Sequence, residues 1–210
     1  MILAGAGGFA KEVFEIIKEN NQTQGLQVYV DKEYKSDQQF YSYPIINDTN
    51  VLKNHFRNDN SFVIGIGNPK SRLDFTQRLI NLGGQPFSLI SPNAELGSQN
   101  VSIGEGTVIL GGARVSNSVT INQGSIVYYN AVIAHDCKIG DFVEISPSAT
   151  ILGNVTIGDL TQIGANATIL PNVTIGKNVI VGAGTVVTKN IEDNSIVVGN
   201  PAVFLRANEE

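Results

Sequence analysis

Residues 138–187 have the sequence KIGDFVEISPSATILGNVTIGDLTQIGANATILPNVTIGKNVIVGAGTVV, which contains a repeat of six residues. Every sixth residue from Ile103 to Val187 is Ile or Val, and no insertion breaks the spacing. A small or apolar residue stands four positions after each of them, from Thr107 to Ile191. A period of six fits neither a helix nor simple strand alternation, but it fits a short strand followed by a tight turn. Three such units make one triangular coil, so the repeat predicts a parallel β-helix.

The fifteen Ile and Val positions predict about five coils between residues 94 and 191. Gly and Asn are frequent between them, and both tolerate the positive φ that tight turns require. An ordinary β-sandwich is disfavoured, because its strand spacing would vary. Cys137 takes a small inward position of the repeat, so it is interpreted as core packing rather than as a nucleophile.

The first 90 residues have no such repeat and follow a β-α-β pattern. Residues 1–10, MILAGAGGFA, combine a buried strand stub with a G-x-G-x-x-A loop, and helically spaced apolar residues follow. Further predicted elements are a strand at 26–30, a strand with its loop at 61–68, a helix at 69–82 and a last strand at 87–90. We therefore expect a small α/β domain over residues 1–90, a Rossmann-like half with parallel strands, and a β-helix domain over 91–210.

The glycine loop at residues 5–10 predicts a nucleotide site. It follows a strand, opens a helix and has Asp31 about 20 residues later, which is the context of a dinucleotide-binding turn. Glycines let a phosphate approach the backbone, and a helix N-terminus favours anions. One Rossmann half is too short for a dinucleotide such as NAD, so a sugar linked to a mononucleotide is the favoured ligand. A tight turn without any ligand is the structural alternative.

The two histidines of the chain have different surroundings. His135 follows the inward Ile133 by two residues, so it should point outward from a turn of the β-helix, where a neighbouring prism would meet it. Histidine titrates near neutral pH, which suits a general base, and Asp136 could orient the ring. His55 lies in a polar segment and is interpreted as structural or solvated. A γ-class carbonic anhydrase needs three histidines for its zinc, so no metal is expected.

Composition narrows the function further. The hydrophobic fraction is 42%, the net charge is −5 and the pI is about 5.0. A nucleic-acid binder usually has a basic face, so that class is not expected. A single cysteine fits a reducing compartment. The first residues do not have the segments of a signal peptide, and no run of about 18 apolar residues predicts a membrane span. We therefore expect a cytoplasmic protein.

The chain resembles a family of sugar acetyltransferases, the group of sialic-acid O-acetyltransferases and bacillosamine-type N-acetyltransferases. The segments that carry the resemblance are GAGGFAKEV (5–13), VYVDKEY (28–34), VIGIGN (63–68), HDCKIGDFVEISPSATILGN (135–154), PNVTIGKNVIVGAGTVVTKN (171–190) and VVGNPA (197–202). The resemblance covers nearly the whole chain. It implies a left-handed parallel β-helix of hexapeptide repeats, a homotrimer with active sites between neighbouring prisms, and acetyl-CoA as co-substrate without a metal.

The implied activity is acetyl-CoA-dependent N-acetylation of a nucleotide-linked deoxy amino sugar, in the biosynthesis of a surface polysaccharide or glycan. By the same resemblance His135 is the general base and Asp136 modulates it. The residues expected to contact the sugar nucleotide are Gly7, Gly8, Phe9, Asp31, Gly67 and Asn68. The residues expected to bind acetyl-CoA are Glu144, Gly153, Ala165 and Ala183.

Three positions depart from the family pattern. Glu144 stands where many relatives have a second histidine, nine residues after the base. Tyr128, with Asn130 nearby, stands where many have Asn, and Lys32 replaces the acid that usually follows Asp31. The residues leave O-acetylation of a sialic-acid-type sugar open, because an amine and a hydroxyl need the same base. They also leave the sugar and its nucleotide open (UDP, dTDP, GDP or CMP). A non-catalytic sugar-nucleotide-binding scaffold is disfavoured by the His135–Asp136 pair.

Overall fold

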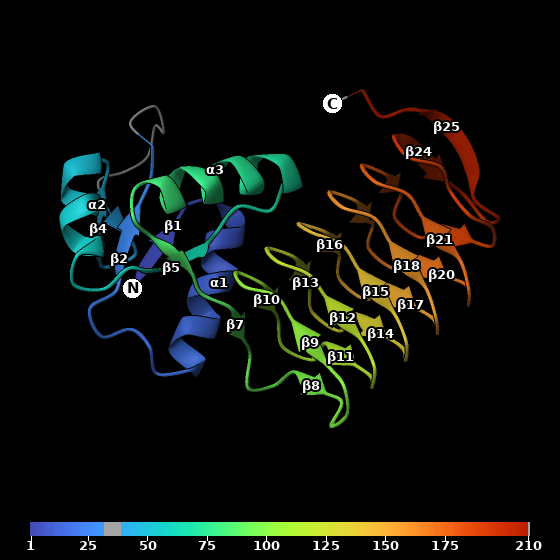
Figure 1. The fold of residues 1–210 in the computed structure, drawn as a ribbon, viewed down its shortest axis with the longest axis horizontal. Coiled ribbons are helices and arrows are strands. Elements are labelled where there is room, and N and C mark those ends of the chain that lie inside the picture. Colours follow the sequence, from blue (N-terminus) through green and yellow to red (C-terminus); the bar gives the residue numbers. More distant parts are fainter. Residues whose placement is uncertain (32–38, 210) are drawn as a thin grey trace.

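A computed structural model describes residues 1–31 and 39–209 of the protein. The chain forms an α/β unit at one end of a long β-helix, and the C-terminal strands lie at the other end (Figure 1). The elements of the α/β unit are β1 (Ile2–Ala4), α1 (Gly8–Glu19), β2 (Gln27–Tyr29), β3 (Gln39–Phe40), β4 (Tyr43–Ile46), α2 (Thr49–Phe56), β5 (Ser61–Ile64), α3 (Pro69–Asn81) and β6 (Gln85–Pro86).

The sheet of this unit has the strand order β3-β4-β2-β1-β5-β6. Among its described strands only the β3–β4 pair is antiparallel. Helix α1 covers the face that carries Leu3, Val28 and Val63. Helices α2 and α3 cover the other face, against Ile2 and Phe62. Because β2 and β5 lie on opposite sides of β1, the strand order reverses there, which is where open α/β sheets bind their ligands.

The β-helix has three faces, each a sheet whose strands lie one coil apart. The first face contains β7 (Leu89–Ile90), β10 (Val108–Ile109), β13 (Ile126–Val127), β16 (Glu144–Ile145), β19 (Gln162–Ile163), β22 (Ile180–Val181), β24 (Ser195–Val198) and β25 (Val203–Ala207). The second contains β8 (Glu95–Leu96), β11 (Arg114–Val115), β14 (Val132–Ile133), β17 (Thr150–Ile151), β20 (Thr168–Ile169) and β23 (Val186–Val187). The third contains β9 (Ser102–Ile103), β12 (Thr120–Ile121), β15 (Lys138–Ile139), β18 (Thr156–Ile157) and β21 (Thr174–Ile175).

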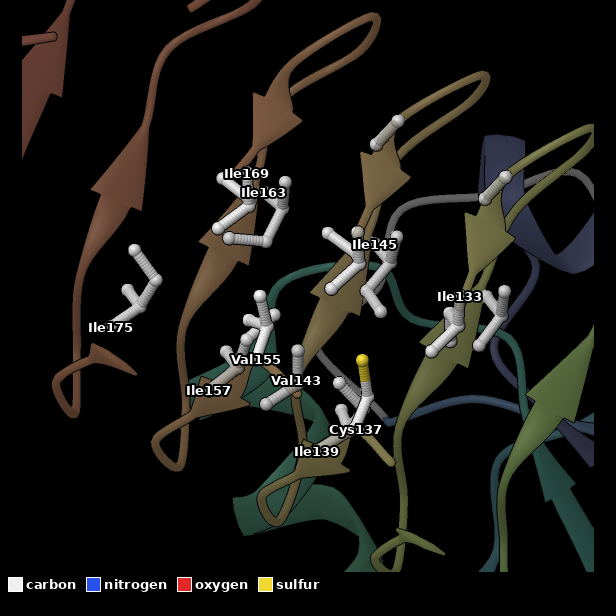
Figure 2. Close-up of a cluster of buried hydrophobic side chains, with 14 of the residues drawn as sticks. Ile133, Cys137, Ile139, Val143, Ile145, Val155, Ile157, Ile163, Ile169 and Ile175 are labelled. Carbon is white, nitrogen blue, oxygen red and sulfur yellow. The ribbon is translucent and has the colours of Figure 1, made fainter. Parts of the chain in front are cut away.

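The interior of the β-helix confirms the predicted register. From Ile109 to Val187 every sixth residue is buried, and Ile103 at the open end is half-buried. Figure 2 shows how these side chains stack coil upon coil inside the prism, with Ile133, Ile145 and Ile169 among them. Cys137 is fully buried in the same core, as its place in the repeat predicts.

The junction between the two units corrects one prediction. Residues 87–90 are not the last strand of the α/β sheet. That sheet ends with β6, which pairs with β5, whereas β7 pairs with β10 as the first strand of the β-helix. The apolar pattern of 87–90 could not distinguish these partners, because a strand buried on either sheet has the same pattern. The sequence analysis also did not identify β3 and β4. One hydrophobic cluster joins α1 to Leu89 and Val108, so the division at residues 90 and 91 stays a proposal.

Candidate active site

A pocket of about 300 Å³ lies at the point where the strand order of the α/β sheet reverses. Its walls are the loops that follow β1, β2 and β5, since the carboxyl ends of parallel strands meet at one edge of the sheet. The lining residues are Gly5, Ala6, Gly7, Gly8, Phe9, Val30, Asp31, Gly65, Ile66, Gly67 and Phe75. Five of the six residues predicted to contact a sugar nucleotide are therefore brought together here.

The glycines of this pocket have two different physical roles. Gly5 has φ +117°, and a Cβ there would lie 3.0 Å from the Gly65 carbonyl oxygen. A Cβ on Gly65 would lie 2.6 Å from the Ala10 Cβ, so the fold itself requires these two glycines. Gly7 and Gly8 are different, because a Cβ on either would meet no atom within 4 Å. Their small size keeps the space in front of α1 open.

The N-terminus of α1 is suited to an anion. Its cap residue is Gly7, which has no side chain to accept a hydrogen bond, and its first turn contains no acidic residue. In α2 and α3, by contrast, Asp48 and Asn68 accept hydrogen bonds from the first-turn N–H groups of Asn50 and Ser71. Uncapped N–H groups at the positive end of a helix favour a phosphate, and Gly7, Gly8 and Phe9 at this helix end line the pocket.

Two residues at the rim have partners within the chain. The Asp31 carboxylate forms an ion pair with Arg78 at 2.9 Å, and the Arg78 guanidinium lies 4.8 Å from the centre of the Phe75 ring. The Asn68 side chain caps α3 and does not line the pocket, so its contact with a ligand stays a prediction. Lys32 lies outside the described residues.

His135 stands at the corner between the second and third faces of the β-helix, here called the His135 corner. Its side chain is 67% exposed, and its Nδ1 lies 2.8 Å from an Asp136 carboxylate oxygen. One coil further along the same corner is Gly153. A Cβ on Gly153 would lie 2.6 Å from Cε1 of His135 and 2.7 Å from its Nε2, so only glycine leaves room for the ring. Sequence reasoning did not predict this role of Gly153, although the spacing of 18 residues is visible in the repeat.

His55 has the opposite environment. It lies on α2, where its Nε2 is buried without a hydrogen-bond partner among the described residues. Burial, helped by the charge of the N-terminus, lowers the pKa of His55. His55 was predicted to be structural or solvated. The burial of Nε2 agrees with a structural residue and not with a fully solvated ring.

A polar cluster lies where the first face of the β-helix meets the α/β unit. The Tyr128 ring packs against Phe9 of the pocket, with ring centres 5.3 Å apart. Burial, helped by the charge of Glu144, raises the pKa of the Tyr128 hydroxyl. Burial also raises the pKa of Glu144, against the opposing effect of Arg72. Two of the three departures from the family pattern, Tyr128 and Glu144, thus lie close together on the first face, next to the α/β unit.

Within one chain the predicted acetyl-CoA residues are not gathered together. Gly153 lies at the His135 corner, whereas Ala165 and Ala183 lie one coil apart at the corner between the first and second faces. Glu144 lies on the first face. The α/β unit also packs on the first face, and the His135 corner of a triangular prism is opposite that face. The glycine pocket and His135 of one copy therefore point to different sides of the molecule.

In residues 1–31 and 39–209, no helix combines the length and the apolar character that crossing a bilayer requires. The same residues contain no group of three His, Cys, Asp or Glu side chains placed to hold a metal ion.

Comparison with known families identifies both parts of the chain. Residues 1–79 match the PglD N-terminal domain family. Residues 136–170 and 154–189 match the bacterial transferase hexapeptide family of six repeats. The predicted fold class, a small α/β domain followed by a left-handed parallel β-helix of hexapeptide repeats, is confirmed. Among curated proteins no sequence matches significantly.

Several solved structures are similar over nearly the whole chain. The acetyltransferase domain of PglB from Neisseria gonorrhoeae, solved with acetyl coenzyme A, is 31% identical with a TM-score of 0.88, and the match covers 97% of this chain and 98% of that one. PerB from Caulobacter crescentus, solved with CoA and GDP-perosamine, is 26% identical with a TM-score of 0.89 and coverage of 98% and 96%. WeeI from Acinetobacter baumannii is 29% identical with a TM-score of 0.87 and coverage of 97% and 98%.

Proposed function

The chain belongs to the hexapeptide-repeat sugar acetyltransferases, and from that premise we propose that it transfers the acetyl group of acetyl-CoA to the amino group of a nucleotide-linked amino sugar. The similar PglB domain binds acetyl coenzyme A, and PerB binds CoA together with GDP-perosamine. The observation that carries the proposal is the pairing of an anion-binding glycine pocket with an exposed histidine–carboxylate pair in one chain.

In the proposed reaction His135 is the general base. When Nδ1–H donates to Asp136 at 2.8 Å, the lone pair of Nε2 is free to take a proton from the acceptor amine. The amine nitrogen attacks the thioester carbon, the C–S bond breaks, and the proton held by His135 passes to the departing thiolate. The Leu152 and Asn154 N–H groups of the nearby turn donate to backbone carbonyls, so the Gly153 N–H between them is the proposed donor to the oxyanion. Asp136 acts through the histidine by fixing its orientation and tautomer.

The glycine pocket is the proposed site of the sugar nucleotide. The uncapped N-terminus of α1 would bind its phosphate groups, and the space kept open by Gly7 and Gly8 would admit them. Phe9 and Val30 would form an apolar wall against the nucleoside, and Asp31 and Gly67 would contact the ligand from the rim. Asn68 would take part through its amide nitrogen, since its oxygen caps α3.

We place acetyl-CoA between copies of the chain and propose a homotrimer. The pocket and the His135 corner of one copy face different sides, so a second copy has to bring its histidine to the first copy's pocket. The same arrangement would bring Gly153 of one copy close to the corner of another copy that carries Ala165 and Ala183. Glu144, beside the pocket, would then face the incoming histidine and the acetyl group. A cytoplasmic location goes with this proposal, in keeping with the reduced, buried Cys137.

The experiment is an acetyl-CoA assay with a panel of UDP-, dTDP- and GDP-linked amino sugars and CMP-sialic acid. We expect one amino sugar to give an N-acetylated product that mass spectrometry and NMR identify as an amide. Its matched sugar nucleotide, with hydroxyl in place of the amine, should not react. Esters formed on CMP-sialic acid or on hydroxyl sugars, without any amide, would contradict the proposal.

A further inference from the structure

Arg72 is the largest fully buried side chain of the described structure, with 1% of its surface exposed. It lies on α3, and none of the ion pairs found among the described residues includes it. Burial lowers the pKa of Arg72 to about 10, so its guanidinium stays protonated at neutral pH. A buried charge is costly unless hydrogen bonds satisfy it, so its partners explain why it is there.

Those partners are backbone carbonyls from two separate parts of the molecule. On the pocket side, Nη1 donates to the carbonyls of Ile66, at 3.3 Å, and Gly67. On the β-helix side, Nε donates to Gly124 at 2.7 Å, and Nη2 donates to Phe142 at 3.0 Å and to Val143 at 3.3 Å. The guanidinium therefore connects the pocket wall to two successive coils of the β-helix.

The carbonyl partners belong to functional parts of the structure. Ile66 and Gly67 line the glycine pocket. Gly124 and Phe142 are stacked turn residues at the corner between the third and first faces, and Val143 leads into β16, which carries Glu144. A planar group with five N–H donors can hold all these oxygens at once, whereas an ammonium cannot.

We propose that Arg72 is a positioning residue, which fixes the sugar-nucleotide pocket at a set distance from the β-helix so that the acceptor meets the acetyl group. This inference rests on the proposed function. Transfer needs the reacting atoms about 3–3.5 Å apart, and a displacement of about 1 Å can cost about 10²-fold in rate. On the pocket side the hydrogen bonds of Arg72 reach only the loop after β5, whereas the loops after β1 and β2 supply Gly7, Gly8, Phe9 and Asp31. We therefore expect the pocket to keep most of its ligand contacts when the connection is loosened.

The test compares Arg72→Lys and Arg72→Met with the control Arg57→Lys, which makes the same change at an exposed arginine of the α/β unit. For both Arg72 variants we expect kcat to fall about 10²-fold, while the Kd of the sugar nucleotide, measured by calorimetry without acetyl-CoA, stays close to that of the wild type. Arg57→Lys should leave both quantities unchanged. Amide hydrogen exchange should accelerate together at residues 65–68 and at Gly124 and Phe142 in the Arg72 variants.

Unchanged kcat in both Arg72 variants would overturn the inference. So would a loss of sugar-nucleotide affinity as large as the loss of kcat, because that result would mean that Arg72 only maintains the pocket. If the wild type acetylates none of the amino sugars, the proposed function fails instead. The exchange measurement then decides on Arg72 alone, and unchanged exchange at these two segments would overturn its connecting role.

Discussion

The β-helix and the α/β unit position their functional groups in different ways. In the β-helix each residue's surroundings follow from its place in the hexad, so functional residues are found where an outward position differs from the equivalent positions of neighbouring coils. At the His135 corner, His135 and Gly153 follow each other at the spacing of one coil. On the first face, Glu144 lies between the outward positions of Ile126 and Gln162. A residue that differs from its equivalents in the hexad repeat therefore indicates where the candidate active site lies.

The α/β unit has no repeat against which a departure could be seen. The surroundings of Gly5, Gly65 and Arg72 are determined by loops and coils far away in the sequence. The sequence alone cannot distinguish a glycine that the fold requires, such as Gly65, from a glycine that leaves room for a ligand, such as Gly8. The β-helix thus supplies residues whose roles can be assigned singly, whereas the α/β unit supplies a pocket that only tertiary contacts define.

The largest effect should come from replacing His135, with His55 of the other region as the comparison. His135→Ala should lower kcat about 10²–10⁴-fold, the usual contribution of a general base, with little change in affinity for the sugar nucleotide. His55→Ala, in the other region, should leave kcat near that of the wild type, because His55 lies on α2 and does not line the pocket. Steady-state kinetics with the accepted amino sugar measure both. Near-normal kcat for His135→Ala would move the base to another residue, with Glu144 next in line.

A core truncation tests the register of the β-helix. Ile151 is fully buried in the stack of inward residues. Ile151→Ala should lower the free energy of unfolding by about 2–5 kcal/mol, the usual cost of removing these buried methyl groups. Thr150→Ala, one residue away and pointing outward from the same strand, should cost far less. Urea unfolding of the two variants measures the difference, and equal losses would contradict the alternation.

Gly153→Ala tests whether a glycine is needed here to leave room for the base. The new Cβ would have to displace the His135 ring, which lies 2.6–2.7 Å from it. We expect kcat to fall about 10–10²-fold, with little change in melting temperature, because the displaced ring is exposed. Gly111→Ala is the control, because a Cβ there would make only ordinary contacts, the nearest at 3.5 Å to the Ser91 hydroxyl oxygen. Full activity of Gly153→Ala would mean that the position of the ring seen here is not needed for transfer.

Gly8→Glu tests the pocket of the α/β unit. Glutamate at the start of α1 should keep or raise the melting temperature, because it complements the helix dipole. The same charge would occupy the anion site, so we expect the Kd of the sugar nucleotide to rise about tenfold or more. Asn50→Glu puts the same charge in the first turn of α2, away from the pocket, and should change the Kd little. Calorimetric titration distinguishes the two variants, and an unchanged Kd for Gly8→Glu would remove phosphate binding from α1.

The sequence was sufficient for the fold of the β-helix and for most of the pocket. The hexad register placed Ile151 and Cys137 inside and His135 outside, because a period of six has one consistent geometry. The glycine loop indicated Gly7, Gly8 and Phe9, which lie together in the structure. The strand at 87–90 was predicted in the α/β sheet but pairs with β10 of the β-helix, because an apolar pattern does not show which strand is the partner.

Arg72 shows why the rest could not be predicted. In the sequence it is one polar residue of a helix, and its five carbonyl partners are separated from it by 5 to 71 positions. Every residue type has a backbone carbonyl, so no sequence pattern could indicate which carbonyls Arg72 binds. The pairing of Phe9 with Tyr128 was hidden for the same reason, because it joins the two units through their tertiary packing.

If the pocket of one copy works with the His135 of another, an oligomer that contains two different variants should regain activity. His135→Ala and Gly8→Glu chains with different tags would be co-expressed and the mixed oligomer purified. In a cyclic trimer of either mixed composition, one site combines an intact pocket from one chain with an intact histidine from another, so about a third of the wild-type sites should be restored. Activity near that level, well above either variant alone, is the predicted result. Activity no higher than that of the two separate variants would contradict the claim, because both halves of the site would then have to come from one chain.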